Sequence, residues 1–356
     1  MIDITVYRQR FVAFARAGQY GRMRELPVAG LVGEVSYQIR AEVLALAAKP
    51  AEEFLPEALK SDYYHAQAKR MGPERARAKL LAMRHLRQSF AKGYRRERAL
   101  APVVIMDGEK FVGRLDGTHR ICAARFFGHK AVNALVVGPD EWSGFLVDRL
   151  YGRFRKWYQP IEIKPGLSTG TFNPAKQGAL LDALPDMNGA SVVDIGCNSG
   201  LYSLECAKRG AAVVGIDRRQ EAIDQAVFVR SVWGARDSRV FNATFECGSI
   251  YDRLDMFTKA GPDTVLMCCV VYHLTDGLHR VLGAIRDSGV RRIIVQGNMR
   301  RARKFKPGEL DAARAQADVP AEAIFDLPRF DALFGRYGFT PEAHKPGQFP
   351  VGLYVR

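Results

Sequence analysis

Short apolar segments alternate with helical segments over the second half of the chain, and this alternation limits the folds open to it. Strands are predicted over Ser191–Ile195, Ala211–Ile216, Val240–Cys247, Thr264–Val271 and Arg291–Gln296. Helices are expected between them, over Leu201–Arg209, Glu221–Trp233 and Asp276–Asp287. Such alternation predicts an α/β fold with a parallel sheet covered on both faces. A helix over Phe330–Tyr337 and strands over Gly338–His344 and Pro350–Val355 predict a closing antiparallel hairpin.

The first half has a different pattern, mostly helical up to about residue 100. Ala76, Leu80, Met83 and Leu86 recur at helical spacing after Pro73. A strand, hairpin turn, strand, helix and strand are then expected over Ala101–Met106, Asp107-Gly108, Lys110–Arg114, Ile121–Phe127 and Val132–Val137. We predict a small helix-rich α+β domain over residues 1–150, a linker or lead-in over 151–172, and the α/β domain over 173–356. A chain of 356 residues is long enough for two domains.

Charge is concentrated in the first half. The whole chain has a formal net charge of +15, of which +12 falls on residues 1–167 and +3 on the remainder. This excess indicates either an anionic partner, such as RNA, a nucleotide, a phosphorylated substrate or acidic lipid, or a solvated helix face. The start of the chain has no signal-peptide pattern, and the run Val265–Val271 is too short to span a bilayer. We therefore expect a cytoplasmic protein.

Six cysteines are present without a C-x-x-C pair. This spacing favours buried, reduced thiols, and we expect no structural metal site. Cys268 and Cys269 fall within a predicted strand, which would direct their side chains to opposite faces.

The most specific motif is the segment VVDIGCNSG, in which Asp194 and Ile195 end a strand and Gly200 begins a helix. Gly196 and Gly200 permit close approach of a ligand to the backbone. The helix start offers N–H groups that suit a carboxylate, and Asp194 suits the amino group of the same ligand. Asp217 ends the next strand, where an acidic side chain can accept both ribose hydroxyls. Asn198 and Leu201 replace glycines of the dinucleotide fingerprint, which argues against NAD.

VVDIGCNSG followed by VVGID resembles motifs I and II of class I S-adenosylmethionine-dependent methyltransferases, over roughly residues 178–356. The resemblance implies a Rossmann-like fold that binds S-adenosylmethionine. It also implies that Gly196, Cys197 and Asn198 line the methionine part, and that Asp217 holds the ribose. Ser249 and Ile250 would flank the adenine, although many relatives have an acidic residue near Ser249.

The reaction site is expected where the fourth strand runs into Tyr272 and His273, because ligands bind beyond the carboxyl ends of the strands in such sheets. His273 is either a general base or a residue that only shapes the pocket. No N-P-P-Y-like segment is present, which disfavours methylation of DNA bases. The pairing of DIGCNSG with VYH also resembles transferases that modify the tRNA wobble uridine. RNA therefore stays a candidate substrate.

The segment GRLDGTHR, with Gly128 and a strand after it, resembles the ParB/sulfiredoxin superfamily. The resemblance implies a loop at Asp116, Gly117, Thr118, His119 and Arg120 that binds the phosphates of ATP, ADP or CTP with Mg²⁺, and a kinase-like activity. Gly117 would allow the turn, Thr118 would cap the helix and Arg120 would grip phosphate. His119 would add a donor when protonated, and Asp116 would hold a metal or orient a donor. The alternatives are that Asp116 only pairs with Arg120, or that the domain only docks partners.

Similar loops after a Tyr-Tyr segment such as Asp62-Tyr63-Tyr64 resemble proteins of bacterial surface-polysaccharide modification. We therefore expect a methyltransferase that acts on an oxygen of a saccharide or phosphosaccharide. Two other classes remain open: a tRNA-modifying methyltransferase, and a binding module with a vestigial transferase. The sequence does not indicate an oligomeric state.

Overall fold

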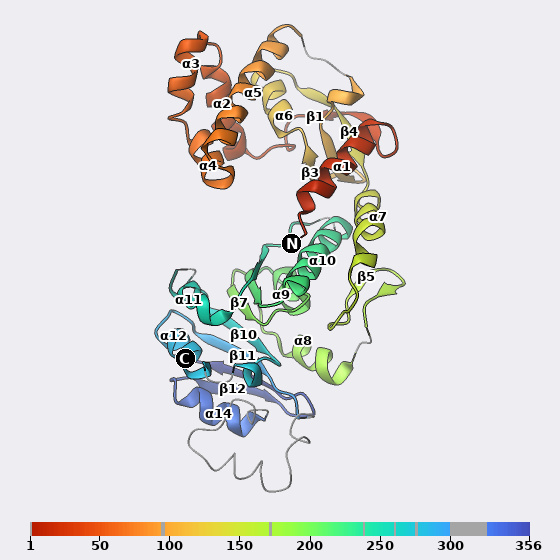
Figure 1. Cartoon of the computed structure of the whole chain (residues 1–356). Helices are drawn as coiled ribbons and strands as arrows, with labels where there is room; N and C mark the ends of the chain where they lie inside the picture. Colours follow the sequence, from red (N-terminus) through yellow and green to blue (C-terminus); the bar gives the residue numbers. More distant parts are fainter. Residues whose placement is uncertain are drawn as a thin grey trace. The chain divides into compact units, whose positions relative to one another are not determined.

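The computed structural model describes residues 2–93, 97–170, 173–237, 239–259, 261–274, 277–299 and 326–356. The chain forms two compact units (Figure 1). The N-terminal unit contains residues 5–145 and 235–238, and the C-terminal unit contains residues 1–4, 146–234 and 239–356. Among the described residues, no helix is both long and apolar enough to cross a membrane.

Within its described residues, the C-terminal unit has a seven-stranded sheet in the order β12-β13-β11-β10-β7-β8-β9. The strands are β7 (Ser191–Ile195), β8 (Ala212–Asp217), β9 (Ala243–Cys247), β10 (Thr264–Cys268), β11 (Arg292–Gln296), β12 (Thr340–Lys345) and β13 (Val351–Val355). The strands β7 to β11 pair in parallel, and β13 pairs antiparallel with both β11 and β12. The predicted parallel sheet and closing hairpin are therefore confirmed. From β7 the chain adds β8 and β9 on one side, and it then returns to place β10 on the other side of β7. Doubly wound sheets bind ligands at such a reversal of strand order.

Apolar residues are buried on both faces of this sheet. Val193, Ile195, Val265 and Met267 share one core with residues of α11 (Asp255–Lys259), α12 (Leu278–Arg286) and α14 (Leu327–Gly335). The helix α9 (Leu201–Lys208) contacts β7, β8 and β9, and α10 (Gln220–Arg236) contributes the buried Phe228 and Val229. The predicted helix over residues 276–287 corresponds to α12, and its expected first residue, Asp276, lies outside the described residues.

The lead-in before this sheet folds as part of the C-terminal unit. It contains the short strands β5 (Glu162–Lys164) and β6 (Leu167–Ser168), and α8 (Ala179–Ala183) follows it. The ring of Trp157 packs against Phe154 and Phe228, and the Trp233 indole N–H donates to the Glu162 carbonyl. Residues 151–170 are thus a packed lead-in, because Phe154 and Trp157 pack against Phe228 of α10.

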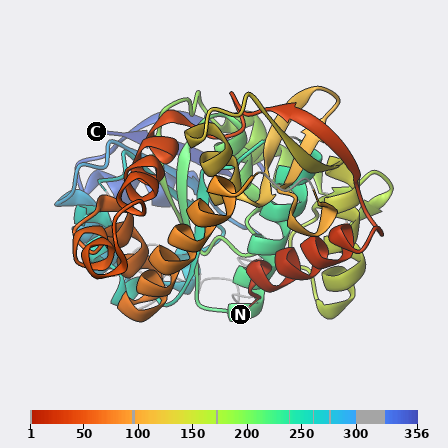
Figure 2. The ribbon, with the colours of Figure 1, turned by 90° about the horizontal axis from the view of Figure 1, so that it is seen from above.

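The N-terminal unit has a sheet in the order β1-β4-β2-β3. Its strands are β1 (Arg22–Pro27), β2 (Val103–Asp107), β3 (Lys110–Asp116) and β4 (Ala131–Val137). Val104 and Met106 share a core with residues of α2 (Glu34–Leu46), α3 (Ala51–Ala58), α4 (Asp62–Met71), α5 (Pro73–Ala91) and α6 (Thr118–Phe126). Figures 1 and 2 show α2 to α5 gathered together, and α1 (Ile4–Arg16) beside α7 (Pro139–Leu150), where Phe11 contacts Trp142 and Phe145.

Two differences from the predicted elements affect the argument. The strand β1 was not predicted, because its sequence RMRELP has no apolar alternation and it lies at a sheet edge. The strand β10 ends at Cys268, short of the expected Val271. Cys269 has a φ of 55°, which no strand accommodates, and Val271–His273 forms a 3₁₀ turn.

Candidate cofactor and methyl-transfer site

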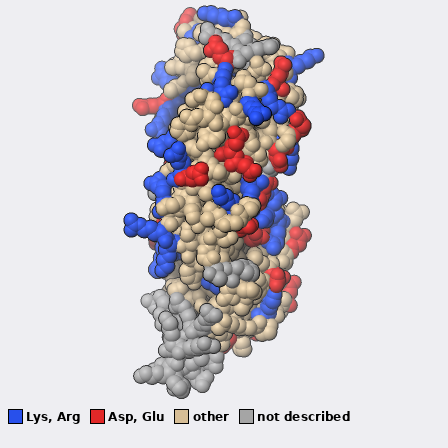
Figure 3. Space-filling model, turned by 90° about the vertical axis from the view of Figure 1, so that its right-hand side faces the viewer, with Lys and Arg blue, Asp and Glu red and all other residues tan. Residues whose placement is uncertain are grey.

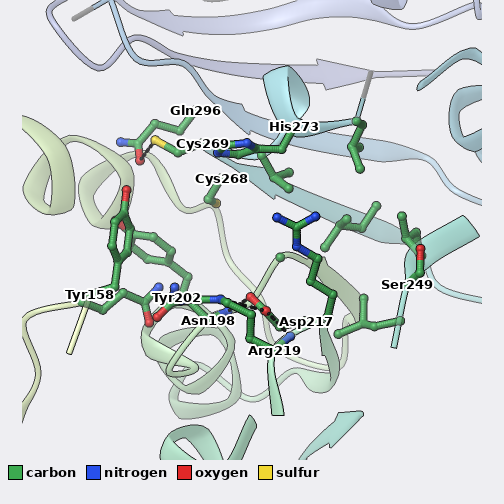
Figure 4. Close-up of a pocket in the computed structure, with 18 of the residues that line it drawn as sticks. Tyr158, Asn198, Tyr202, Asp217, Arg219, Ser249, Cys268, Cys269, His273 and Gln296 are labelled. Atoms are coloured by element: carbon green, nitrogen blue, oxygen red, sulfur yellow. Dashed lines mark hydrogen bonds and ion pairs between the residues drawn. The ribbon is translucent and has the colours of Figure 1, made fainter. Parts of the chain in front are cut away.

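A cavity of about 450 Å³ lies at the carboxyl ends of β7, β8 and β10 (Figure 4). Of the residues predicted for the cofactor and reaction sites, it is lined by Gly196, Asn198, Asp217, Ser249, Ile250 and His273. Figure 4 shows Ser249 at one end, Tyr158 and Tyr202 at the other, and His273 on the opposite wall from Asp217. The cavity therefore joins the predicted cofactor loop to the predicted reaction site.

The loop after β7 is shaped by residues in left-handed conformations. Gly196 has a φ of 72°, and a Cβ there would lie 2.8 Å from Val270 Cγ2. Asn198 also has a positive φ, of 55°. Gly200 has a φ of 80° and packs closely against Phe245, so it serves packing and does not line the cavity. Cys197 is likewise buried and does not line the cavity, contrary to the expected contact with the methionine part.

Asp217 is the acidic residue that lines the cavity within the described part of the chain. One carboxylate oxygen accepts a hydrogen bond from the backbone N–H of Arg219 at 2.9 Å, and the other accepts one from the backbone N–H of Asn198 at 3.1 Å. The Arg219 guanidinium also lies 3.4 Å from the carboxylate. These contacts fix the orientation of a carboxylate at a strand end, as the recognition of ribose hydroxyls requires.

Asp194 does not reach the cavity, which corrects its expected role as a partner for an amino group. Its side chain is 1% exposed and accepts the Ser203 hydroxyl at 2.6 Å. Burial raises the pKa of its carboxyl to about 7, against the opposing hydrogen bond from Ser203. Asp194 therefore links the end of β7 to Ser203 of α9 and stabilises the loop between them.

The backbone N–H groups of the loop are already used inside the protein. Gly196 and Cys197 donate to the Ile216 carbonyl, Asn198 donates to Asp217, and Ser199 donates to the Asn198 side chain. Gly200 donates to the Cys197 carbonyl, and Leu201 donates to Gln159 Oε1 at 3.1 Å. The expected free donors for a carboxylate are therefore absent from residues 196–201 in the described structure.

The reaction end is built by the turn after β10. Cys268 and Cys269 both line the cavity and do not point to opposite sheet faces, because Cys269 leaves the strand conformation. His273 lines the cavity, whereas Tyr272 is 3% exposed and does not. Burial raises the pKa of the Tyr272 hydroxyl, and its ring lies 4.7 Å from the His273 ring. The Tyr272 ring thus packs against His273 and does not line the cavity, unlike its expected place beside the transferable methyl group. Cys247 is exposed, contrary to the expected burial of all six thiols.

Several lining residues were not predicted from the sequence. Tyr158, Gln159 and Lys176 come from the lead-in and the turn after it, Tyr202 from α9, and Gln296 from the end of β11. Gln296 could have been found, because it ends a parallel strand beside the switch point. No local sequence pattern marks Gln159, since its role depends on its hydrogen bond with the Leu201 N–H.

The N-terminal unit has its own cavity, of about 590 Å³. It is lined by Arg16, Arg75, Lys79, Asp116, Gly117, His119 and Arg120 among others. Gly117 has a φ of 94° and a Cβ there would lie 2.5 Å from Pro102, so the turn requires glycine as predicted. Thr118 is the first helical residue and forms no cap, because Gly117 occupies the capping position.

Two charged residues of this second cavity differ from their expected roles. Asp116 pairs with Arg16 at 2.5 Å. Among the described residues, no group of three potential ligands that could hold a metal is formed. His119 shares a 2.7 Å hydrogen bond with the Tyr63 hydroxyl, and burial lowers its pKa to about 4. The imidazole of His119 therefore carries no charge near pH 7 in the protein without a bound anion, whereas the expected phosphate donor is its protonated form.

Comparison with known proteins gives the class of the C-terminal unit. Residues 186–301 match the model of a methyltransferase domain family. Over 130 residues, or 35% of this chain, the sequence is 32% identical to the ribosomal protein L11 methyltransferase of Salmonella arizonae. The same relative from Salmonella newport matches to the same extent. The chain spans 39% of the length of these curated relatives.

Solved structures with related folds are more distant. Magnesium protoporphyrin IX methyltransferase from Synechocystis PCC 6803 is 20% identical, with 50% of this chain and 75% of that chain covered and a TM-score of 0.36. The bifunctional kinase-methyltransferase WbdD is 21% identical, with 60% and 45% covered and a TM-score of 0.39. The N-terminal domain of EvdMO1, solved with S-adenosylhomocysteine and D-fucose, is 14% identical, with 59% and 94% covered and a TM-score of 0.42.

The sheet order and the family match together define the class of the C-terminal unit: it contains a Rossmann-like α/β domain whose residues 186–301 match the methyltransferase domain family. Within the chain, the family match runs from just before β7 to just after β11.

Proposed function

We propose that the chain transfers the methyl group of S-adenosylmethionine to an oxygen of a saccharide or phosphosaccharide. The observation that carries the proposal is the single cavity shared by Asp217 and His273. The acceptor oxygen attacks the methyl carbon, the carbon–sulfur bond breaks, and S-adenosylhomocysteine leaves. His273 takes the hydroxyl proton, either before or during attack.

The mouth of the cavity supports a ring-shaped acceptor. Tyr158 lines the cavity and is 55% exposed, so its ring is open to a ligand at the surface. A flat ring of this kind packs against the C–H face of a sugar. It also stacks on a nucleobase, which keeps RNA as the alternative substrate.

The test uses S-adenosylmethionine with a labelled methyl group. The protein is incubated with separate saccharide and RNA fractions of a cell extract. We expect label in the saccharide fraction, and we expect His273→Gln to lower the transfer at least tenfold while S-adenosylhomocysteine binding is retained. Label in RNA would support the tRNA-modifying class, and binding without transfer to either fraction would support a vestigial transferase.

We propose in addition that the N-terminal cavity binds the phosphates of a nucleotide or of a phosphorylated substrate. Four basic side chains line it, and its one carboxylate, Asp116, is paired with Arg16. An excess of positive charge in a concave site raises the local concentration of anions. ATP, ADP and CTP should each be tested for thermal stabilisation of the unmodified protein and of Arg120→Gln. No stabilisation of the unmodified protein, or equal stabilisation of the variant, would leave this unit as an acceptor-docking or structural domain.

A further inference from the structure

The cofactor proposed above has a carboxylate that the glycine loop does not bind. S-adenosylmethionine ends in an α-amino acid, and its carboxylate needs hydrogen-bond donors or a cation when it enters a cavity. All backbone N–H groups from Gly196 to Leu201 donate to atoms of the protein. Side chains that line the cavity are therefore candidates for these donors, and Tyr202 lies at the end of the cavity away from Ser249 (Figure 4).

Tyr202 is the first of these donors. It follows the loop in the first turn of α9, is 4% exposed and lines the cavity. Its hydroxyl is buried and forms no hydrogen bond within the described structure. Buried polar groups are nearly always paired, so an unpaired hydroxyl that lines a cavity indicates a missing ligand atom. Burial, more than the neighbouring Cys268, raises the pKa of this hydroxyl, which therefore keeps its proton and donates.

Lys176 is the second donor. Its ammonium lines the same cavity and lies 4.5 Å from the centre of the Tyr158 ring and 3.4 Å from the Tyr158 hydroxyl. It forms no ion pair with a carboxylate of the described residues. The amide of Gln296 donates to the Lys176 carbonyl at 2.6 Å and so holds this turn against the end of β11. A cation is thus fixed in the cavity without an acidic partner.

Tyr158 and Cys268 connect the two donors. Lys176 contacts Tyr158, and Figure 4 shows the side chains of Tyr158 and Tyr202 close together at one end of the cavity. Cys268 interacts electrostatically with both Tyr202 and Lys176. Asp217, the acidic lining residue, lies toward the adenosine end and is already paired with Arg219. Lys176 therefore faces the cavity without a carboxylate of the described residues beside it, whereas Asp217 is neutralised by Arg219.

We propose that Lys176 and Tyr202 bind the carboxylate of the amino-acid part of S-adenosylmethionine. The ammonium of Lys176 supplies charge, the hydroxyl of Tyr202 supplies a directed hydrogen bond, and Tyr158 holds the ammonium in place. This inference rests on the proposed use of S-adenosylmethionine. It assigns to the turn after the lead-in and to α9 the recognition that the glycine loop was expected to provide.

A comparison of two ligands tests this carboxylate contact by itself and does not require the acceptor to be known. S-adenosylhomocysteine has the carboxylate, whereas 5′-methylthioadenosine has the same adenosine and thioether but no amino-acid part. Calorimetric titration of both ligands should be carried out on the full chain and on Lys176→Gln, Tyr202→Phe and Lys164→Gln. Lys164 is exposed in the same lead-in and does not line the cavity, so its variant controls for loss of one positive charge.

We expect Lys176→Gln to lower the affinity for S-adenosylhomocysteine about tenfold or more, and Tyr202→Phe to lower it about threefold to tenfold. Binding of 5′-methylthioadenosine should change less than twofold in both variants, and Lys164→Gln should change neither ligand. Tyr202→Phe should not lower the thermal stability of the free protein, because it removes a hydroxyl that has no partner.

Equal losses for both ligands, or unchanged affinity for S-adenosylhomocysteine, would overturn the assignment of Lys176 and Tyr202. Failure of the unmodified, folded chain to bind either ligand would instead overturn the proposed cofactor. Retained binding of 5′-methylthioadenosine by each variant also shows that the variant is folded.

Discussion

Asp217 carries the most specific cofactor contact expected of this chain. Its carboxylate is oriented by the N–H groups of Asn198 and Arg219 and faces the cavity. Asp217→Ala should weaken S-adenosylhomocysteine by about 1.5–3 kcal/mol, because charge-assisted hydrogen bonds to the ribose are lost. Asp252→Ala, an exposed carboxylate that does not line the cavity, is the matched control. Equal affinity of the two variants in calorimetry would contradict the ribose role.

Asp194 makes the free energy of unfolding depend on pH. Burial raises its pKa to about 7, far above its usual value of 3.8, so the folded protein binds this proton more tightly than the unfolded chain does. The stabilisation from this group is therefore complete below about pH 4 and is lost as the pH rises to about 7. Urea titrations between pH 4 and 8 should show this decline in the unmodified protein and a flatter profile in Asp194→Asn. Parallel profiles would exclude Asp194 as the source.

The lead-in is the element that the cavity depends on most. The Thr169 hydroxyl donates to the Gln159 carbonyl at 2.7 Å and accepts the Ile161 N–H at 2.7 Å, and Thr169 is 1% exposed. Thr169→Val keeps the shape of the side chain but removes both hydrogen bonds, so we expect the free energy of unfolding to fall by about 1–3 kcal/mol. Limited proteolysis should then cut within residues 151–170 faster than in the exposed control Ser168→Ala. Equal cutting rates would show that these bonds do not hold the lead-in.

Elements with a strong apolar period were predictable from the sequence. The strands β7, β8 and β11 match their predicted ranges within one residue, because both faces of a parallel strand are buried and the apolar run marks its length. The edge strand β1 has exposed charged residues and no such run. The end of β10 depends on the φ of 55° at Cys269, which its apolar sequence does not reveal.

The candidate site was predictable only where it follows a strand end. Asp217, Gly196 and His273 lie at the cavity because strand ends meet there. Asp194 and Tyr272 are buried and do not line the cavity, and such burial depends on packing that sequence spacing does not specify. The bond between Gln159 and Leu201 joins residues 42 positions apart, and no local pattern encodes such a contact.

At the scale of the whole molecule, the charge distribution distinguishes the candidate acceptors. The face drawn in Figure 3 has basic side chains interspersed with acidic ones. Because the proposed acceptor is a saccharide, we expect weak binding of bulk tRNA with a shallow salt dependence. Filter binding between 50 and 200 mM salt measures the slope. A micromolar complex that weakens about a thousandfold over this range would favour the RNA-modifying class.

The central claim is that this chain binds S-adenosylmethionine in the cavity between Asp217 and His273. Calorimetric titration of the full chain with S-adenosylhomocysteine tests it directly. The account predicts saturable binding of one molecule per chain, and marked weakening in Asp217→Ala. A folded protein that gives no binding heat, with no protection by the ligand against thermal unfolding, would contradict it.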